Sequence, residues 1–477
     1  MADDPGKVGA QLRGWDAATF RTASGDPRMR STVVALAVLD SSPDWDRLRT
    51  RLERLTHFVP TLRMRPLYGM FGFSAPRLAL DPDFDIDVHV HRYRLPDGSG
   101  WNEVLADVRR MSLTDFDRNR ALWEAVLIEG LPDGGAAFAL KLHHSIADGQ
   151  ATVMMALSLF ELGIDPNPDD PDTPDVPQGE DVSLVDIAKA NVEDNLVRFK
   201  DSAEGLLKAG GQIALQALGD PGGALDVVRQ TVESVTKAVS VPESPLSPLW
   251  VARGTTYHFG TFEFAFDGLK HAAKSRGFSV NDAFMAAVAS GVDRYHQRYG
   301  TTVTELRVNV PISLRGDAGD RSGQAANAVA IARFEMPVDG LDIDEQMAAV
   351  HELVDTWRNA PAMRMADPLA DVSWFVPVPV LAHAAKASDI TTSNVPGPPI
   401  PMYLAGARMV AAFPLVATIG AAVNVTMVTY DGRACIGVST DDRSVPDHLE
   451  LLEDLRWGFE LVTGDVVGPA DRYAEAR

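Results

Sequence analysis

The first part of the chain alternates between segments with the hydrophobic period of a strand and segments with that of a helix. Residues 31–40 (STVVALAVLD) form an apolar run that is typical of a strand. Residues 44–58 place Leu48, Leu52 and Leu55 on one side of a helical wheel, which predicts an amphipathic helix. The two periods together predict a mixed α/β lobe.

A β-hairpin is predicted next. Residues 122–130 and 136–144 are two apolar runs that the turn sequence LPDGG separates. Alternation along the second run puts His144 on the face that carries its even-numbered apolar residues and His143 on the opposite face. Residues 149–163 then have the composition and period of a buried helix.

Two changes in composition divide the chain. Residues 165–181 are rich in proline and aspartate, which predicts a surface linker, and residues 183–240 are helical in period but interrupted by glycine. We therefore expect an N-terminal lobe over residues 1–165, an acidic linker and helical crossover over 166–245, and a C-terminal lobe over 246–477.

The C-terminal lobe again mixes the two periods. Residues 257–266 alternate as a strand should, and residues 446–464 have helical spacing. Ser279 with Asp282 three positions later matches the capping box that begins many helices. These segments predict a second unit of sheet and helices.

A charge-free run at residues 409–430 is long enough to span a bilayer as a helix. Pro414, Gly420 and Asn424 interrupt it, and an Asp-Gly turn at residues 431–432 leads into another β-branched run. The sequence therefore favours buried strands over a membrane span. Any lipid contact is then expected to be peripheral, at a membrane or a lipid droplet surface.

Composition narrows the class of protein. The 477 residues are 45% hydrophobic, which predicts a large buried core, and 44 Lys and Arg against 66 Asp and Glu give a net charge of −22. Without a compensating basic cluster, nucleic acid is not an expected partner. The single cysteine, Cys435, excludes an internal disulfide framework, and the acidic N-terminus lacks the apolar core of a signal peptide. These features predict a cytoplasmic protein.

The stretch HHSIADG contains His143, His144, Asp148 and Gly149. Histidines on opposite faces of a strand do not easily converge on one ion, and no second ligand pair lies nearby, so no metal site is expected. In a structural interpretation, Asp148 caps the following helix and Gly149 permits a tight entry into it. In a chemical interpretation, a neutral imidazole takes the proton of a hydroxyl group. The residues alone leave both open.

This stretch resembles the HHxxxDG signature of the CoA-dependent acyltransferase superfamily, which includes chloramphenicol acetyltransferase, carnitine acyltransferases and the condensation domains of peptide synthetases. Four further stretches lie in the order of the blocks of the wax ester synthase/acyl-CoA:diacylglycerol acyltransferase family and resemble them. They are residues 115–131 (DFDRNRALWEAVLIEGL), 277–288 (GFSVNDAFMAAV), 308–315 (VNVPISLR) and 393–409 (SNVPGPPIPMYLAGARM). The resemblance covers nearly the whole chain.

The resemblance implies a two-lobed, mixed α/β fold like that of chloramphenicol acetyltransferase, with a tunnel between the lobes. It implies no cofactor, because acyl-CoA enters as a substrate and meets a hydrophobic alcohol, either diacylglycerol or a long-chain alcohol. The expected product is triacylglycerol or wax ester, formed by direct attack in a ternary complex. The sequence has no GxSxG elbow and no Cys-His pair that would indicate a covalent intermediate.

The resemblance also implies roles for individual residues. Carried over by position, His144 is the general base and His143 supports its geometry. Asp148 is a further member of the catalytic motif, and the partner implied for Asp148 is Arg63 in the stretch PTLRMR. Gly149 is implied as structural support.

Asn281 is the implied hydrogen-bond donor to the oxyanion of the tetrahedral intermediate. It lies in the first turn of its predicted helix, where backbone N–H groups favour negative charge. The neighbouring Asp282 is implied as structural support, and a purely structural capping role for this turn stays open.

Two positions depart from the family pattern. Ala121 stands where the block that begins Pro-Leu-Trp usually has its proline, and Arg253 is a single arginine where two are usual. If the segment around Arg253 positions a substrate, substrate choice has changed in this chain.

Two alternatives remain. The first is an acyltransferase of the same fold that takes its acyl group from a carrier protein or uses a different, soluble acceptor. The second is a non-catalytic lipid-binding protein that has kept the tunnel. His143, His144 and Asn281 speak against the second, because a protein that only binds has no need of a base facing an oxyanion donor.

Overall fold

The computed structural model describes most of the chain, as a series of segments with gaps between them. The described residues are 8–69, 75–146, 155–156, 158–167, 171–176, 178–194, 244–313, 329–358, 377–465 and 467. Asp148, Gly149 and most of the predicted crossover at 183–240 lie outside these segments.

Six strands form the sheet of the first lobe, in the order β12-β13-β2-β7-β6-β5. Their bounds are Tyr403–Leu404 (β12), Ala407–Val416 (β13), Thr32–Leu39 (β2), Ala136–His143 (β7), Trp123–Glu129 (β6) and Val90–Arg94 (β5). Strands β6 and β7 pair antiparallel, which confirms the predicted hairpin. A small separate sheet has the order β1-β4-β3 and comprises Ala10–Gln11 (β1), Arg77–Leu80 (β4) and Met64–Leu67 (β3).

Six further strands form the sheet of the second lobe, in the order β10-β9-β11-β14-β15-β8. Their bounds are Val329–Pro337 (β10), Glu305–Ser313 (β9), Ile390–Val395 (β11), Val423–Tyr430 (β14), Arg433–Asp441 (β15) and Tyr257–Ala265 (β8). Strand β11 runs parallel to both of its neighbours, whereas the other pairs are antiparallel. Both predicted lobes are therefore mixed α/β units.

Helices pack against both sheets. Their bounds are Gly14–Gly25 (α1), Trp45–Phe58 (α2), Trp101–Leu113 (α3), Phe266–Ser275 (α7), Val280–Arg298 (α8), Ile343–Arg358 (α9), Val378–Lys386 (α11) and His448–Thr463 (α12). Short 3₁₀ turns are Pro27–Met29 (η1), Pro60–Arg63 (η2), Ile86–Val88 (η4), Pro132–Gly134 (η5) and His144–Ile146 (η6).

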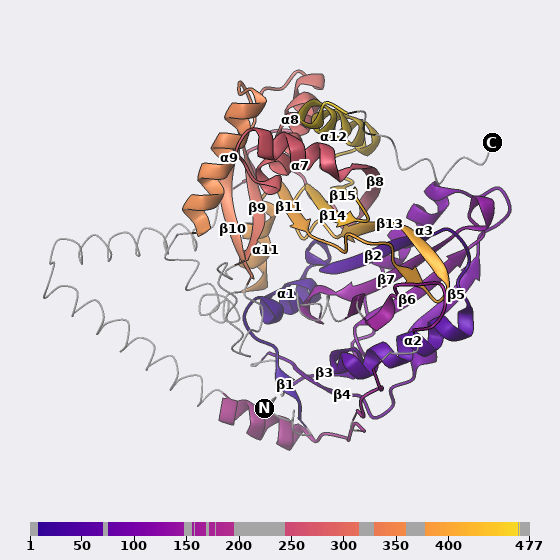
Figure 1. The fold of residues 1–477 in the computed structure, drawn as a ribbon. Coiled ribbons are helices and arrows are strands. Elements are labelled where there is room, and N and C mark those ends of the chain that lie inside the picture. The colour runs from indigo at the N-terminus through magenta and orange to yellow at the C-terminus, as the bar shows by residue number, and fades with distance from the viewer. Residues whose placement is uncertain are drawn as a thin grey trace, which may run out of the picture.

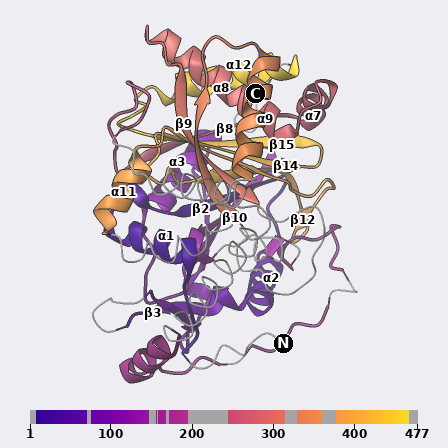
Figure 2. The same ribbon diagram turned by 90° about the vertical axis from the view of Figure 1, so that its left-hand side faces the viewer.

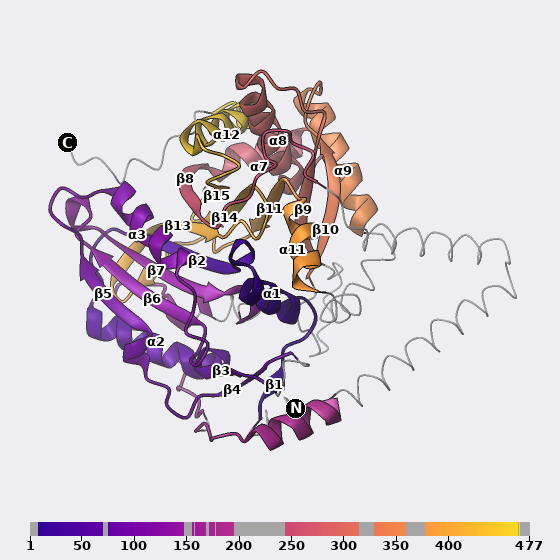
Figure 3. The ribbon, with the colours of Figure 1, turned by 180° about the vertical axis from the view of Figure 1, so that it is seen from behind.

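Three hydrophobic clusters define the layers (Figure 1). The largest joins the second sheet to α7, α8, α9 and α12, on the face turned away from the first lobe. Another packs α2 against the first sheet, with Leu48, Leu52 and Leu55 fully buried as the spacing predicts. The third joins the opposite face of the first sheet to α3 and the second sheet, so the two sheets meet between the lobes, as the view from behind also shows (Figure 3).

The second half of the chain completes the sheet of the first lobe. Strand β13 pairs antiparallel with β2, with Phe413 opposite Leu36. Gly437 on β15 lies so close to the carbonyl oxygen of Pro414 on β13 that no side chain fits between them. The predicted division at residues 165 and 245 assigns β13 to the C-terminal lobe, although this strand completes the sheet of the first lobe. The division itself stays a prediction.

The charge-free run at 409–430 is strand, as predicted. It forms most of β13 and the whole of β14, and β14 continues into β15 through a turn in which Asp431 has φ 44° and Gly432 has φ 77°. Positive φ at both central residues is the geometry of a type I′ hairpin, which an Asp-Gly pair favours. Among the described residues, no helix is both long and apolar enough to cross a membrane.

Candidate functional site

Strand β7 ends at His143, one residue earlier than the predicted strand. His144 begins the 3₁₀ turn η6 and its backbone N–H donates to the carbonyl of Ser31 at 2.8 Å. The prediction that His144 shares a strand face with the even-numbered apolar residues is therefore wrong, because the backbone turns at this point. The prediction that the two histidines diverge is confirmed: His143 is buried and His144 is exposed.

His143 is held in an apolar environment. Its ring is 2% exposed and packs against the rings of Phe20 and Phe116 at centroid distances of 5.4 and 5.7 Å. Burial lowers its pKa to about 3, so the ring is neutral at physiological pH. The backbone N–H of Ser145 donates to Nδ1 at 3.2 Å, and the Ser145 hydroxyl lies 2.8 Å from the same nitrogen. The ring proton therefore resides on Nε2, which is buried and has no hydrogen-bond partner among the described residues.

His144 combines an exposed side chain with a lowered pKa. Desolvation by the surrounding protein causes the shift, and a hydrogen bond from the ring to the backbone of the same residue opposes it. A neutral imidazole keeps one ring nitrogen as a proton acceptor.

Arg63, the predicted partner of Asp148, has partners of its own. Its Nε donates to the hydroxyl of Thr56 at 2.8 Å, its Nη2 forms an ion pair with Glu53, and its guanidinium lies over the ring of Phe84 at 4.7 Å. These contacts tie the end of α2 to η2. Because Asp148 lies outside the described residues, the pairing between the two stays a prediction.

Asn281 and Asp282 lie in the outer helical layer. Asp282 completes the predicted capping box, since it accepts from the backbone N–H of Ser279 at 2.9 Å, and it also accepts from His351 at 3.0 Å. The amide of Asn281 lies 3.6 Å from the sulfur of Met285 on the same helix. The second sheet separates this helix from the first lobe (Figure 1). The structure therefore does not bring Asn281 together with His144, and its role as oxyanion donor stays a prediction.

Lys141 is a buried basic residue that no sequence motif marks. It lies two residues before His143 on the same strand face, and its side chain is only 2% exposed. Its Nζ donates to the carbonyl of Thr114 at 2.9 Å, lies 4.3 Å from the centre of the Phe116 ring and 3.6 Å from Glu124. Burial lowers its pKa. The only signal in the sequence was the strand alternation that places Lys141 beside His143.

Arg253 connects several segments of the second lobe through hydrogen bonds. The side chain is 8% exposed and donates to the carbonyls of Gly420 and Ser388, both at 2.7 Å, and to the Ser444 hydroxyl at 3.0 Å. Its guanidinium thus satisfies carbonyl groups of segments far apart in the sequence. This position supports a structural role for Arg253, and a change in substrate choice through it stays a prediction.

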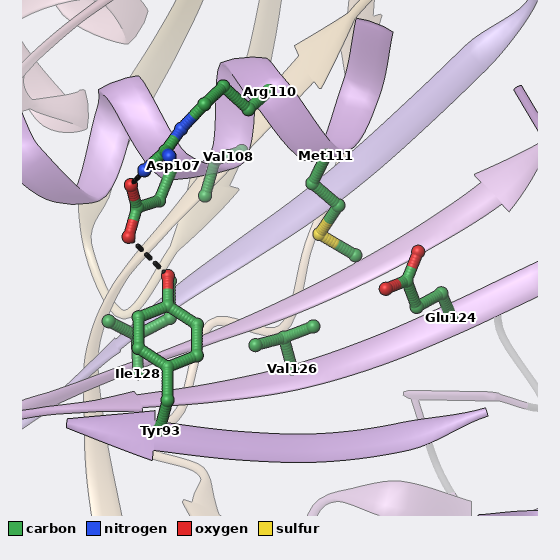
Figure 4. Close-up of a pocket in the computed structure, with 8 residues that line it drawn as sticks. All are labelled: Tyr93, Asp107, Val108, Arg110, Met111, Glu124, Val126 and Ile128. Carbon is green, nitrogen blue, oxygen red and sulfur yellow. Dashed lines mark hydrogen bonds and ion pairs between the residues drawn. The ribbon is translucent and has the colours of Figure 1, made fainter. Parts of the chain in front are cut away.

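A cavity of about 310 Å³ lies between α3 and strands β5 and β6 (Figure 4). Its lining residues are Tyr93, Asp107, Val108, Arg110, Met111, Glu124, Val126 and Ile128. The Tyr93 hydroxyl donates to Asp107 at 2.6 Å, and Arg110 pairs with the same carboxylate. Because these groups satisfy one another, the cavity does not present them to a reacting molecule. Among the described residues, no group of three His, Cys, Asp or Glu side chains could hold a metal ion.

The fold is that of the two-lobed acyltransferases and condensation domains. The chain matches the wax ester synthase/diacylglycerol acyltransferase from Marinobacter aquaeolei VT8 with a TM-score of 0.60 and 20% identity, over 96% of this chain and 100% of that one. It matches the first condensation domain of the calcium-dependent antibiotic synthetase with a TM-score of 0.56 and 16% identity, over 97% and 98% of the two chains. These likenesses establish the architecture.

Sequence comparison identifies the family. Residues 12–284 match the wax ester synthase/diacylglycerol acyltransferase catalytic domain, and residues 325–463 match the C-terminal domain of the same family. The chain is 31% identical over 458 residues, 94% of its length and 91% of the relative, to a putative diacylglycerol O-acyltransferase of Mycobacterium tuberculosis. The chain therefore belongs to the wax ester synthase/diacylglycerol acyltransferase family, and it is an acyltransferase.

Proposed function

We propose that this acyltransferase moves a fatty acyl group from acyl-CoA to the hydroxyl group of a hydrophobic alcohol. With diacylglycerol the product is triacylglycerol, and with a long-chain alcohol it is a wax ester. The observation that carries the proposal is the position of His144, which begins the turn η6 directly after β7 with an exposed side chain; its pKa is also lowered. The proposal needs no cofactor, because acyl-CoA is itself an activated substrate.

In the proposed reaction, the neutral ring of His144 takes the hydroxyl proton while the alcohol oxygen attacks the thioester carbonyl carbon. The new carbon–oxygen bond forms, and the carbonyl electrons move onto the oxygen to give a tetrahedral oxyanion. The oxyanion then collapses, the carbonyl re-forms and the carbon–sulfur bond breaks. The departing thiolate takes the proton from the His144 imidazolium, so CoA leaves as a thiol and the histidine is neutral again.

The electrostatics of the site suit a base at physiological pH. A lowered pKa keeps His144 neutral, and only the neutral ring can accept a proton.

We propose His143 as a positioning residue. Its hydrogen bonds to Ser145 span the residue between them, which is His144, and they connect the buried ring to the turn η6. Packing against Phe20 and Phe116 fixes the ring itself. The proposed contributions of Asp148 and Gly149 rest on the sequence motif.

A cytoplasmic location with peripheral contact to a membrane or lipid droplet completes the proposal. The alcohol and the product are both lipids, so the reaction calls for contact with a lipid surface. The net charge of −22 argues against simple electrostatic adhesion to anionic lipid.

The experiment that tests the function is incubation of the full chain with a mixture of acyl-CoAs and hydrophobic alcohols, with mass spectrometry of the neutral lipids formed. We expect triacylglycerol or wax ester from the wild-type chain. His144→Ala should lower the rate about 10²- to 10⁴-fold, because the general base is lost. His91→Ala is the matched control, since His91 is an exposed histidine on β5 of the same sheet.

If His144→Ala kept more than a few per cent of the wild-type rate, His144 would not be the general base. Ligand binding without turnover across the whole panel would support the non-catalytic alternative. Transfer from an acylated carrier protein but not from acyl-CoA would support the same-fold alternative.

A further inference from the structure

The face of the second sheet that the helices do not cover carries an arginine that forms no ion pair with any described acidic residue. Arg333 lies on β10, the edge strand, and points away from the face that the helices cover, because its neighbours Ala332 and Phe334 belong to the cluster under those helices. The only hydrogen bond of its guanidinium to a described residue runs from Nε to Oδ1 of Asn309, at 3.3 Å. Both Nη groups are left without an acceptor there.

The described groups around Arg333 do not balance its positive charge. Burial lowers its pKa, and the second contribution comes from the like charge of Arg307. Arg307 itself is paired with Glu335 at 3.1 Å and donates to the carbonyl of Ala387 at 2.9 Å. A partly desolvated guanidinium beside another one, in a chain with 66 acidic residues, is the arrangement expected where an anionic ligand supplies the missing charge.

Asn309 adds a second unused donor. Its Oδ1 accepts both from Arg333 and from the hydroxyl of Ser388 at 3.1 Å. Two bonds to the oxygen fix the amide orientation, and its Nδ2 group has no acceptor among the described residues. An oriented amide next to a guanidinium with free Nη groups offers several N–H donors to one group of oxygens.

A row of polar residues leads from this point toward the histidine pair. Neighbouring strands carry them in register, and in order from the edge they are Arg333, Asn309, Thr391, Asn424 and Ser439. The row crosses three inter-strand steps between β10 and β14, which is about 14 Å at the usual strand spacing.

The inner end of the row reaches the first lobe. The Asn424 amide donates to the carbonyl of Ala417 at 3.4 Å, and the Ala417 N–H donates to the carbonyl of Thr32 at 2.9 Å. Thr32 is the strand partner of His143. Helix α11, which precedes Ser388, lies beside α1, and α1 contacts the turn that carries His144 (Figure 2). Hydrogen bonds and strand pairing thus connect the inner end of the row to the strand that ends at His143.

We propose that Arg333 and Asn309 bind phosphate groups of the acyl-CoA donor. The inference rests on the proposed function for the identity of the donor. Bound there, the nucleotide end would lie at the edge of the second sheet while the pantetheine arm extends toward the first lobe. A guanidinium with two free Nη groups suits phosphate, which it can bind in a bidentate manner.

Calorimetric titration of the full chain with adenosine 3′-phosphate 5′-diphosphate, which carries every phosphate group of CoA, tests the site without turnover. We expect Arg333→Gln to weaken binding about tenfold or more, because a charge-assisted bidentate contact is lost. Arg333→Lys should fall between, since it keeps the charge but loses the fork. Arg94→Gln is the matched control, because Arg94 is an exposed arginine on β5, the edge strand of the other sheet.

Kinetics separate this inference from the proposed function. Arg333→Gln should raise KM for palmitoyl-CoA about tenfold and leave kcat within twofold, while KM for the palmitoyl thioester of N-acetylcysteamine, which has no phosphate, stays unchanged. Equal nucleotide affinity in wild type and Arg333→Gln, or an equal rise in KM for both donors, would overturn the site. Nucleotide binding that depends on Arg333 in a chain that transfers no acyl group would uphold the site and refute the proposed function instead.

Discussion

His143 and His144 are adjacent in sequence but occupy opposite environments. His143 is 2% exposed, with Nδ1 2.8 Å from the Ser145 hydroxyl, whereas the His144 side chain is exposed on the turn η6. The strand ends between them, so the backbone turn and not strand alternation alone separates the two rings. This difference is consistent with the roles proposed above, His143 as a positioning residue and His144 as the general base.

The pH dependence of transfer should report His144. Its pKa lies below the ordinary value of 6.5 because the surrounding protein desolvates the ring, and the ring accepts a proton only when it is neutral. We therefore expect kcat/KM to stay level from pH 8 down past 6.5 and to fall only at lower pH, as the ring becomes protonated. Initial rates between pH 4.5 and 8 measure this limb. An acid midpoint at or above 6.5 would contradict the assignment.

The stability of the fold should depend on His143 in acid. Its pKa is about 3 in the folded chain against 6.5 when unfolded, so only the unfolded chain takes up this proton between those values. The free energy of unfolding is therefore complete above pH 6.5 and falls by about 1.4 kcal/mol per pH unit below it. Urea unfolding at pH 7.5 and 5 should show a flatter dependence for His143→Phe than for wild type. Identical slopes would contradict the prediction.

The position of Asn281 in the structure does not match the role of oxyanion donor that the sequence resemblance implies. Its amide lies beside the Met285 sulfur in the outer helical layer, so we expect Asn281→Ala to lower kcat less than tenfold. A true oxyanion donor would cost about 10²- to 10³-fold. Saturating rates, with thermal unfolding as the check on folding, distinguish the two. A loss in the larger range would establish the donor role that the family resemblance implies.

Gly437 tests the contact between the two sheets. A Cβ at this position would overlap the carbonyl oxygen of Pro414 on β13, and this backbone atom cannot move without shifting a strand. We expect Gly437→Ala to lower the free energy of unfolding by about 2 kcal/mol or more. Gly163→Ala is the control, because a Cβ there meets open space. Equal unfolding midpoints for the two variants would contradict the prediction, because the added Cβ would then not disturb the contact between the sheets.

Local features of the fold were predictable from the sequence because they depend on neighbouring residues. The spacing of Leu48, Leu52 and Leu55 predicted α2, and Ser279 with Asp282 predicted the beginning of α8. The Asp-Gly pair predicted the hairpin between β14 and β15. Periodicity, capping and turn geometry act over a few residues, so no tertiary information was needed.

The sequence by itself also determined the family and the histidine pair, because the motif blocks follow one another along the chain. Only the tertiary structure decided that β13 joins the sheet of the first lobe, that His144 lies beyond the strand end, and that Arg333 and Asn424 belong to one polar row. The physical reason is that strand order is not chain order: β9, β11 and β14 become neighbours through long connections, which local patterns do not specify. Burial and the pKa values that follow from it depend on those same non-local contacts.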